Sequence, residues 1–284
     1  MPVAERIILD LEGKEDKSAS VLLITVWELG EAAGPLLIAP LSEIYGRYLV
    51  FNVANILFII GVALAALSPT ANLLIFARFL TGFAVAGNVL NPAIIGDIYP
   101  SESRGSGMSL VSLAPLLGGA IGPAISGAIA ETLGWRMILV LSGVVAVTCE
   151  ILFFILFRET YKVPILKRRA ARLRKENKDD TLKCAWEGEG EMSAWSTLRV
   201  SIKRPLTILL DSTILKVMAF YGGVIFAFYY VLATTLPSIL KEVYGFSPAM
   251  TGLSFLSFSK YLRLKPENFT DTKRSGCKRR YRHM

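Results

Sequence analysis

The chain alternates long apolar stretches with short polar breaks, and this pattern predicts a series of membrane-spanning helices. Each stretch holds about 20 residues, the length that an α-helix needs to cross roughly 30 Å of hydrocarbon at 1.5 Å per residue. No charged residue occurs between Arg47 and Arg78, and the break at 68–70 divides that stretch into two helices joined by a tight turn. The expected spans lie near residues 20–42, 49–68, 72–95, 107–130, 136–157 and 213–238. The pattern therefore predicts an all-α polytopic membrane protein with about six transmembrane helices.

The overall composition favours a membrane protein over a soluble one. Of the 284 residues, 53% are hydrophobic and only 19% are charged, and the mean hydropathy is +0.49. Soluble domains carry about 25% charged residues, and the polar surface here would be too small to cover so apolar a core. The net charge of +8 is concentrated in residues 259–284, where nine Lys and Arg residues oppose two acidic ones. Because the rest of the chain is nearly balanced, we expect no nucleic-acid partner.

The residues that commonly carry enzymatic chemistry are scarce. The only histidine is His283, which excludes Ser-His-Asp catalysis and histidine-based zinc or haem sites. The cysteines, Cys149, Cys184 and Cys277, are far apart and give neither a disulfide framework nor a metal-ligand spacing. No GxxxxGK[ST] loop is present, so we do not expect ATP to drive the protein. The sequence predicts neither an enzyme nor a bound cofactor or metal.

The distribution of basic residues orients the spans. The connections around Arg47 and Arg104 and the segment 158–205 carry most of the basic side chains, whereas the turns at 69–71 and 131–136 carry few. Basic loops remain in the cytoplasm, so the first span is expected to run from outside to inside.

One long polar segment divides the spans into two groups. We expect a polar N-terminal segment (1–19), a first helical group (20–158), a cytoplasmic linker (159–205), the start of a second helical group (206–258) and an unfolded basic tail (259–284). Within the linker, apolar residues recur at helical spacing among many basic ones: Val163, Leu166, Ala170 and Leu173. This spacing predicts a short basic helix lying on the inner leaflet, with a calmodulin-binding helix as the alternative.

Two acidic residues, Glu28 and Glu31, lie near the middle of the first span. Their i, i+3 spacing puts both carboxylates on one helical face. Because a charge at membrane depth is costly, we expect these groups to pair with a cation or to take up a proton. Arg78 lies at a similar depth in the third span, and we expect it to pair with Glu28 or Glu31. The set favours proton coupling or recognition of a cationic substrate; the alternative is an ion pair that only holds helices together.

Acidic and basic residues also gather at two expected cytoplasmic turns. In SEIYGR, Glu43 and Arg47 can latch neighbouring helix ends, and Gly46 permits a sharp turn. In DIYPSESRG, Asp97 and Arg104 lie on the same side of the membrane. We therefore expect one cluster of these charges, unless DIYPSESRG is an ordinary solvated loop.

The fourth span contains a run of small residues, GGAIGPAISG. Gly118 and Gly122 are spaced i, i+4 and allow another helix to approach closely. Pro123 bends or loosens the helix, and Gly127 ends the run. This pattern predicts a helix–helix contact at short range.

These motifs resemble those of the major facilitator superfamily, in the form typical of fungal drug:proton antiporters of the multidrug and polyamine type. PLSEIYGR resembles the loop between helices 2 and 3, with Ala39 where Gly is usual and Glu43 where Asp is usual. LLIFARFLTGFAVAG resembles helix 4, and DIYPSESRG resembles the loop that follows it. GGAIGPAISG resembles the helix-5 antiporter motif, with Ser109 and Ser126 in place of glycine. With ETYKVPIL and YGFSPAMTGLSFLS, the resemblance covers about residues 20–258.

The resemblance implies twelve helices in two six-helix halves that alternate access to a central substrate site. In that numbering the chain covers helices 2 to 7, so the first helical group is an N-terminal half without helix 1. The implied activity is export of small organic molecules, including cations and drugs, in exchange for protons, by a multi-pass protein of the plasma membrane. The implied partners are the lipid bilayer, a small-molecule substrate and protons. The alternative is a truncated chain that does not transport, or a partner of another transporter subunit.

Overall fold

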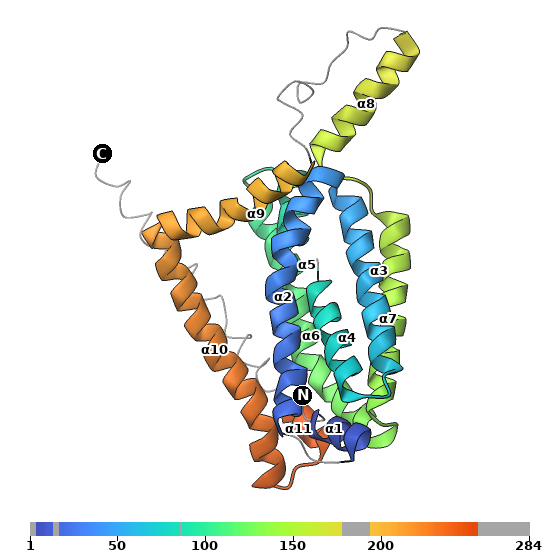
Figure 1. The fold of residues 1–284 in the computed structure, drawn as a ribbon, viewed down its shortest axis with the longest axis vertical. Coiled ribbons are helices and arrows are strands. Elements are labelled where there is room, and N and C mark those ends of the chain that lie inside the picture. Colours follow the sequence, from blue (N-terminus) through green and yellow to red (C-terminus); the bar gives the residue numbers. More distant parts are fainter. Residues whose placement is uncertain (1–3, 14–16, 86, 178–193, 255–284) are drawn as a thin grey trace, which may run out of the picture.

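The computed structural model describes residues 4–13, 17–85, 87–177 and 194–254, whose arrangement is shown in Figure 1. Within these ranges the chain forms helices and no strand, as the hydrophobic pattern predicts. The helices are α1 (Ala4–Glu12), α2 (Lys17–Tyr45), α3 (Arg47–Ala66), α4 (Ala71–Phe83), α5 (Gly87–Ile98), α6 (Arg104–Thr132), α7 (Trp135–Leu156), α8 (Lys162–Asn177), α9 (Ala194–Asp211), α10 (Thr213–Glu242) and α11 (Pro248–Ser254). The basic tail expected at 259–284 lies outside the described residues.

Among the described helices, α2, α3, α6, α7 and α10 are long and apolar enough to cross a membrane. They correspond to the spans expected at 20–42, 49–68, 107–130, 136–157 and 213–238. No residue in the most apolar stretch of α6, α7 or α10 is buried, which suits helices that face lipid or further protein. The all-α polytopic fold is thereby confirmed.

The span expected at 72–95 is divided between two shorter helices. α4 ends at Phe83, and α5 begins at Gly87. The hydrophobic pattern missed this break because apolar and small residues continue through it.

Helices α2 and α4 approach each other through glycines. A Cβ atom on Gly30 or Gly34 would overlap backbone atoms of residues 79–83 in α4. A Cβ on Gly82 would overlap the backbone carbonyl of Trp27 in α2. The absence of side chains at these positions lets the two backbones touch, which brings the helices that carry Glu28 and Arg78 together.

Helix α1 lies across the lower ends of the bundle in Figure 1. Its apolar side is buried at Ile7, and on its polar side Asp10 accepts a hydrogen bond of 3.0 Å from the Trp135 indole of α7. Asp10 also lies 3.7 Å from the guanidinium of Arg136. The sequence pattern described 1–19 only as polar and missed this amphipathic helix, which is too short to resemble a span.

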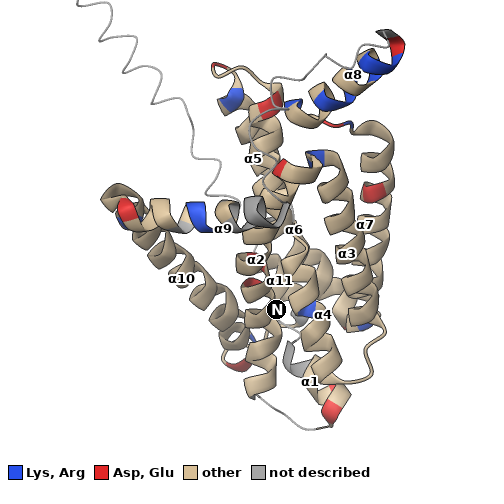
Figure 2. Ribbon diagram, turned by 45° about the horizontal axis from the view of Figure 1, so that its top comes forward, with Lys and Arg blue, Asp and Glu red and all other residues tan. Residues whose placement is uncertain are grey.

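The opposite end of the bundle carries α8 and α9. Figure 1 shows α9 running across that end and α8 projecting beyond it, and Figure 2 shows basic residues gathered there, on α8 above all. The expected linker, 159–205, contains α8, but its boundary at 205 falls inside α9, and residues 178–193 are outside the described ranges. Because basic segments remain in the cytoplasm, we expect this to be the cytoplasmic end.

Candidate functional site

The turn between α2 and α3 is built on Gly46. Its φ of +101° lies in the region that favours glycine. A Cβ atom there would also overlap the carboxylate of Glu159, which packs against the turn. A side chain at this position would strain the turn and displace Glu159.

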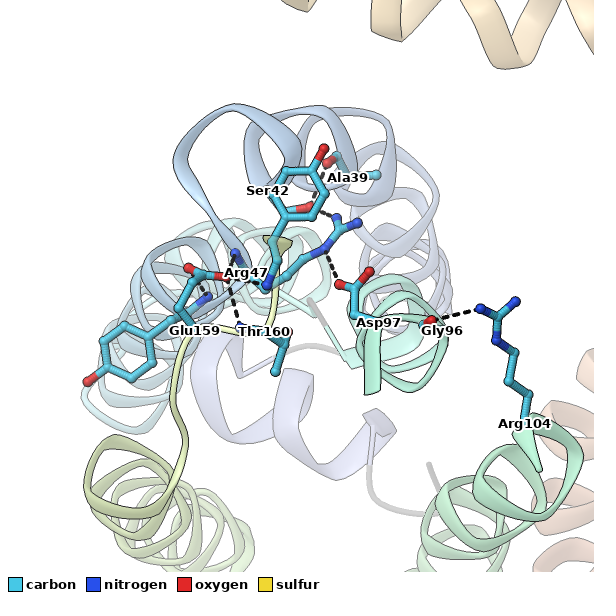
Figure 3. Close-up of polar contacts among 10 residues, drawn as sticks. Ala39, Ser42, Arg47, Gly96, Asp97, Arg104, Glu159 and Thr160 are labelled. Carbon is cyan, nitrogen blue, oxygen red and sulfur yellow. Dashed lines mark hydrogen bonds and ion pairs between the residues drawn. The ribbon is translucent and has the colours of Figure 1, made fainter. Parts of the chain in front are cut away.

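Glu159, just after α7, binds the first turn of α3. Its Oε1 accepts a hydrogen bond of 3.0 Å from the backbone N–H of Arg47, and its Oε2 accepts one of 3.3 Å from Tyr48 (Figure 3). Oε1 also accepts hydrogen bonds from the N–H groups of Thr160 at 3.1 Å and Tyr161 at 2.9 Å. The first N–H groups of a helix have no partner within it, and the helix dipole favours an anion there. Glu159 therefore ties the end of α7 to the start of α3.

The side chain of Arg47 is buried between three helices and the segment that follows α7. The residue is 7% exposed, and its Nε lies 3.4 Å from Oδ2 of Asp97 in α5. Its Nη1 donates to the hydroxyl of Ser42, and its guanidinium lies 4.9 Å from the centre of the Tyr161 ring. A carboxylate, a hydroxyl and an aromatic face together compensate for the burial of this charge. We call Ser42, Arg47, Asp97, Glu159 and Tyr161 the cytoplasmic cluster.

Arg104 lies beside this cluster and binds backbone rather than a carboxylate. Its Nε donates to the carbonyl of Tyr99 at 3.1 Å, and its Nη2 donates to the carbonyl of Gly96 at 2.9 Å (Figure 3). The last carbonyls of a helix lack helical donors, so Arg104 caps α5 next to Asp97. Of the charges expected to gather at these turns, the structure pairs Arg47 with Asp97, whereas Arg104 supports the helix that carries Asp97.

Glu43 is exposed on the last turn of α2 and influences the cluster through its charge. Burial is the largest cause that raises the pKa of the Tyr161 phenol, and the carboxylate of Glu43 raises it further. Arg47 lowers this pKa and Asp97 raises it. The phenol of Tyr161 is therefore neutral at physiological pH and offers Arg47 a neutral ring.

A cavity of about 560 Å³ lies among α2, α3, α4, α6 and α7. Its lining is mainly apolar, and its charged members are Glu28 of α2 and Arg78 of α4, which attract each other electrostatically. Thr81 adds a hydroxyl, and Gly118 contributes backbone surface from α6. Pockets for small organic molecules have volumes of about 300–1,000 Å³ and an apolar lining with few polar groups. This cavity has the size and lining of such a pocket.

Glu28 has a further partner in the second helical group. The hydroxyl of Tyr230 on α10 lies close enough to its carboxylate for the two groups to interact electrostatically. Glu31, one turn along α2, is close enough to Tyr230 for its charge to act on the same hydroxyl. Glu28 thus connects Arg78 in the first helical group to Tyr230 in the second.

The small-residue run on α6 divides into an open part and a packed part. A Cβ atom on Gly118 or Gly122 would meet no atom of the described chain within 4 Å. The close contact lies further along, where a Cβ on Gly252 of α11 would overlap the carbonyl of Pro123. Gly127 is buried. Within the run, the structure places the contact at Pro123 and not at the glycine pair.

The sequence pattern did not single out Ser42, Glu159, Tyr161 or Tyr230. Ser42 lies within SEIYGR, and Glu159 and Tyr161 belong to ETYK, so the cytoplasmic position of both motifs could have suggested that they meet. Tyr230 gives no such signal, because α10 contains several aromatic residues and only helix packing selects the one that reaches Glu28.

Known proteins with similar sequences agree with this architecture. The family model described as Major Facilitator Superfamily matches residues 15–260. The efflux pump radE of Floropilus chiversii is 34% identical over 257 residues, which cover 90% of this chain and 47% of that protein. The MFS transporter fsa7 of Fusarium sp. is 36% identical over 246 residues, covering 85% and 47% of the two chains. The MFS-type transporter hepF of Aspergillus oryzae is 33% identical over 248 residues, covering 86% and 49%.

These matches confirm the resemblance that the motifs indicated. The chain spans about half the length of the curated relatives it matches, and the three relatives come from fungi. The family is one of transporters and not of enzymes, and the apolar helices make the chain an integral, multi-pass membrane protein. Its match over residues 15–260 shows that this chain belongs to the major facilitator superfamily.

Proposed function

We propose that this chain forms the proton-coupling part of an exporter of small organic molecules, cations among them. The observation that supports this most directly is that Glu28 and Arg78 line one cavity of about 560 Å³ and attract each other electrostatically, with the hydroxyl of Tyr230 acting on Glu28 as well. The name of the Floropilus relative, an efflux pump, supports export as the direction. The plasma membrane is proposed by analogy with other exporters of the family.

Glu28 is the group proposed to exchange a proton for substrate. A carboxylate at membrane depth is costly unless it is paired, and here Arg78 and Tyr230 provide that compensation. A cationic substrate in the cavity would compete with a proton for the same carboxylate. Because each would weaken the binding of the other, substrate and proton would be exchanged rather than carried together. Glu31 is proposed to assist, because its charge also reaches Tyr230.

The cytoplasmic cluster is proposed to stabilise one conformational state of the transporter. The Arg47–Asp97 ion pair joins α3 to α5, and Glu159 joins α3 to α7. Any rearrangement of these helices must break the contacts or carry them along as one body. Three further residues are proposed to support the same switch. Glu43 contributes its charge, Gly46 forms the turn between α2 and α3, and Arg104 caps α5.

The small-residue run on α6 is proposed to be the surface on which the second helical group, or another transporter subunit, packs. Gly252 of α11 already meets Pro123 at this surface. Gly118 and Gly122 leave room for a further helix, because a Cβ on either would meet no atom of the described chain within 4 Å. Gly127 extends the packed part.

Binding of a cationic dye tests the proposed site. The 284-residue chain, reconstituted in nanodiscs, is expected to bind rhodamine 6G, measured by fluorescence polarisation, and to bind it more weakly as the pH falls. Glu28→Gln is expected to reduce the affinity by about tenfold, or roughly 1.4 kcal/mol. Glu150→Gln is the matched control, because Glu150 lies in α7 and accepts a hydrogen bond of 2.6 Å from the Asn55 amide. Equal dye affinities of the Glu28→Gln and unmodified chains would contradict the proposal.

The second candidate function is that of a membrane protein that does not transport by itself, either a fragment or a partner of another transporter subunit. It is favoured by the match to about half the length of the relatives. Expression in a yeast strain that lacks its own drug exporters separates the two candidates. Proton-dependent dye efflux that is lost in a Glu28→Gln, Glu31→Gln double variant supports transport, whereas dye binding without efflux supports the second candidate.

A further inference from the structure

We propose that α8 binds the anionic phospholipid headgroups of the inner leaflet. This inference rests on the expected orientation of the basic end of the bundle and not on the proposed transport activity. α8 contains one acidic residue, Glu176, and seven basic ones: Lys162, Lys167, Arg168, Arg169, Arg172, Arg174 and Lys175. A polybasic segment directly beside a spanning helix is attracted to a leaflet that carries anionic lipid.

The basic residues of α8 surround a narrow apolar stripe. At 100° per residue, the stripe is formed by Val163, Leu166, Ala170 and Leu173. Lys167 and Arg174 border it on one side, and Arg169 borders it on the other. Leu166 and Leu173 are 37% and 39% exposed. A stripe of this kind can enter the headgroup region while the long basic side chains beside it reach the phosphates.

The start of α8 is held at the membrane surface. Only residues 157–161 separate it from α7, which spans the membrane. Two residues of that connection, Glu159 and Tyr161, belong to the cytoplasmic cluster and are fixed by their contacts with Arg47. The first turn of α8 must therefore lie at the cytoplasmic surface, within reach of lipid headgroups.

No other described helix covers α8. It projects from the bundle in Figure 1 and packs extensively against none of the helices in the described ranges. Its direction therefore depends on the backbone where the connection ends, between Tyr161 and the first turn of α8, and a rotation there can lay the helix on the leaflet while Glu159 and Tyr161 keep their contacts. The leaflet is the one surface near α8 that combines negative charge with an apolar interior, which matches both features of the helix.

Fluorescence of a probe on the apolar stripe tests the proposal. A 284-residue chain with Cys149, Cys184 and Cys277 replaced by Ser and with Leu173→Cys is labelled with NBD. It is then reconstituted in nanodiscs of phosphatidylcholine with or without phosphatidylserine. We expect a blue shift of the NBD emission, and quenching by doxyl-labelled lipid, only with phosphatidylserine. Both changes should reverse in about 1 M salt, where the Debye length falls to roughly 3 Å.

Two pairs of charge removals make the test specific. Lys167→Gln with Arg169→Gln, which removes one bordering charge on each side of the stripe, should lower the ratio of docked to undocked α8 by roughly tenfold or more. The matched control is Lys203→Gln with Arg204→Gln, which removes two exposed charges from α9 at the same end and should leave the NBD signal unchanged. Equal signals in both lipid compositions, or an equal loss in both variants, would overturn the proposal. A response to inorganic phosphate or to calcium-loaded calmodulin without phosphatidylserine would overturn it in favour of those ligands.

Discussion

The carboxylate of Glu159 accepts a hydrogen bond of 3.0 Å from the backbone N–H of Arg47, although 112 residues separate the two in sequence. The side chain of the same Arg47 forms an ion pair with Asp97. One acid therefore holds the backbone of Arg47 and another holds its guanidinium. This arrangement connects α3 to α7 through the first contact and to α5 through the second, so loss of either acid should loosen a different pair of helices.

Replacing Glu159 by Ala is expected to destabilise the chain by about 1–3 kcal/mol, because it removes a charged cap from the N-terminus of α3. The measurement is the midpoint of thermal unfolding in detergent. Glu159→Gln keeps one acceptor and should lose less. Glu176→Ala on the exposed α8 is the control and should leave the midpoint unchanged. A Glu159→Ala chain that is as stable as this control would contradict the capping role.

Replacing the residue that corresponds to Arg47 by Ala in a full-length relative is expected to reduce transport while expression stays intact. The reason is that Arg47 makes both the ion pair with Asp97 and the contact with Ser42, which a switching role requires to form and break. Lys should restore transport only in part, since it lacks the planar fork of donors. Arg158→Ala, an exposed charge at the same end, is the control. Unchanged transport kinetics would leave Arg47 with a topological role alone.

Tyr161 is expected to ionise above the ordinary pH range of tyrosine. Because its folded pKa is raised, its contribution to stability is complete below about pH 10 and is lost as the pH rises through the folded pKa. Glu43→Gln removes a charge that raises this pKa, so the titration should move to lower pH. The phenolate absorbance of Tyr161 is obtained by subtracting the spectrum of a Tyr161→Phe chain. A titration that does not move would place Glu43 outside the electrostatic reach of the cluster.

The sequence predicts the long spans because each is encoded in its own apolar residues. It fails between α4 and α5, because α4 ends at Phe83 although the hydrophobic pattern continues. It also fails at α1, whose burial depends on contacts with other helices and not on an apolar run. Local composition therefore predicts that a helix crosses the membrane, but it does not predict where that helix ends.

The candidate site could likewise be predicted from the sequence only in part. Charged residues inside an apolar stretch, such as Glu28 and Arg78, can be recognised as candidates from the sequence, because burying a charge is costly. Tyr230 is an ordinary residue in an aromatic helix, and only its proximity to Glu28 distinguishes it from the other aromatic residues of α10. Glu159 is similar, since its partners are backbone N–H groups that every residue possesses. Contacts of this kind depend on how the helices pack, which periodicity does not encode.

The close approach of α2 and α4 yields the sharpest expected difference between two chemically identical substitutions. Gly82→Ala would place a methyl group against the backbone carbonyl of Trp27, and a backbone atom cannot rotate away. The two helices must separate, at a cost of about 1–3 kcal/mol, and Glu28 must move away from Arg78, so binding of rhodamine 6G should weaken as well. Gly122→Ala adds the same methyl group to α6, where it would meet no atom of the described chain within 4 Å, and should change neither property. Thermal unfolding and dye binding, measured on both variants, decide the matter. Equal tolerance of the two substitutions would mean that the backbones of α2 and α4 do not touch at Gly82, and the proximity of Glu28 to Arg78 would lose its structural basis.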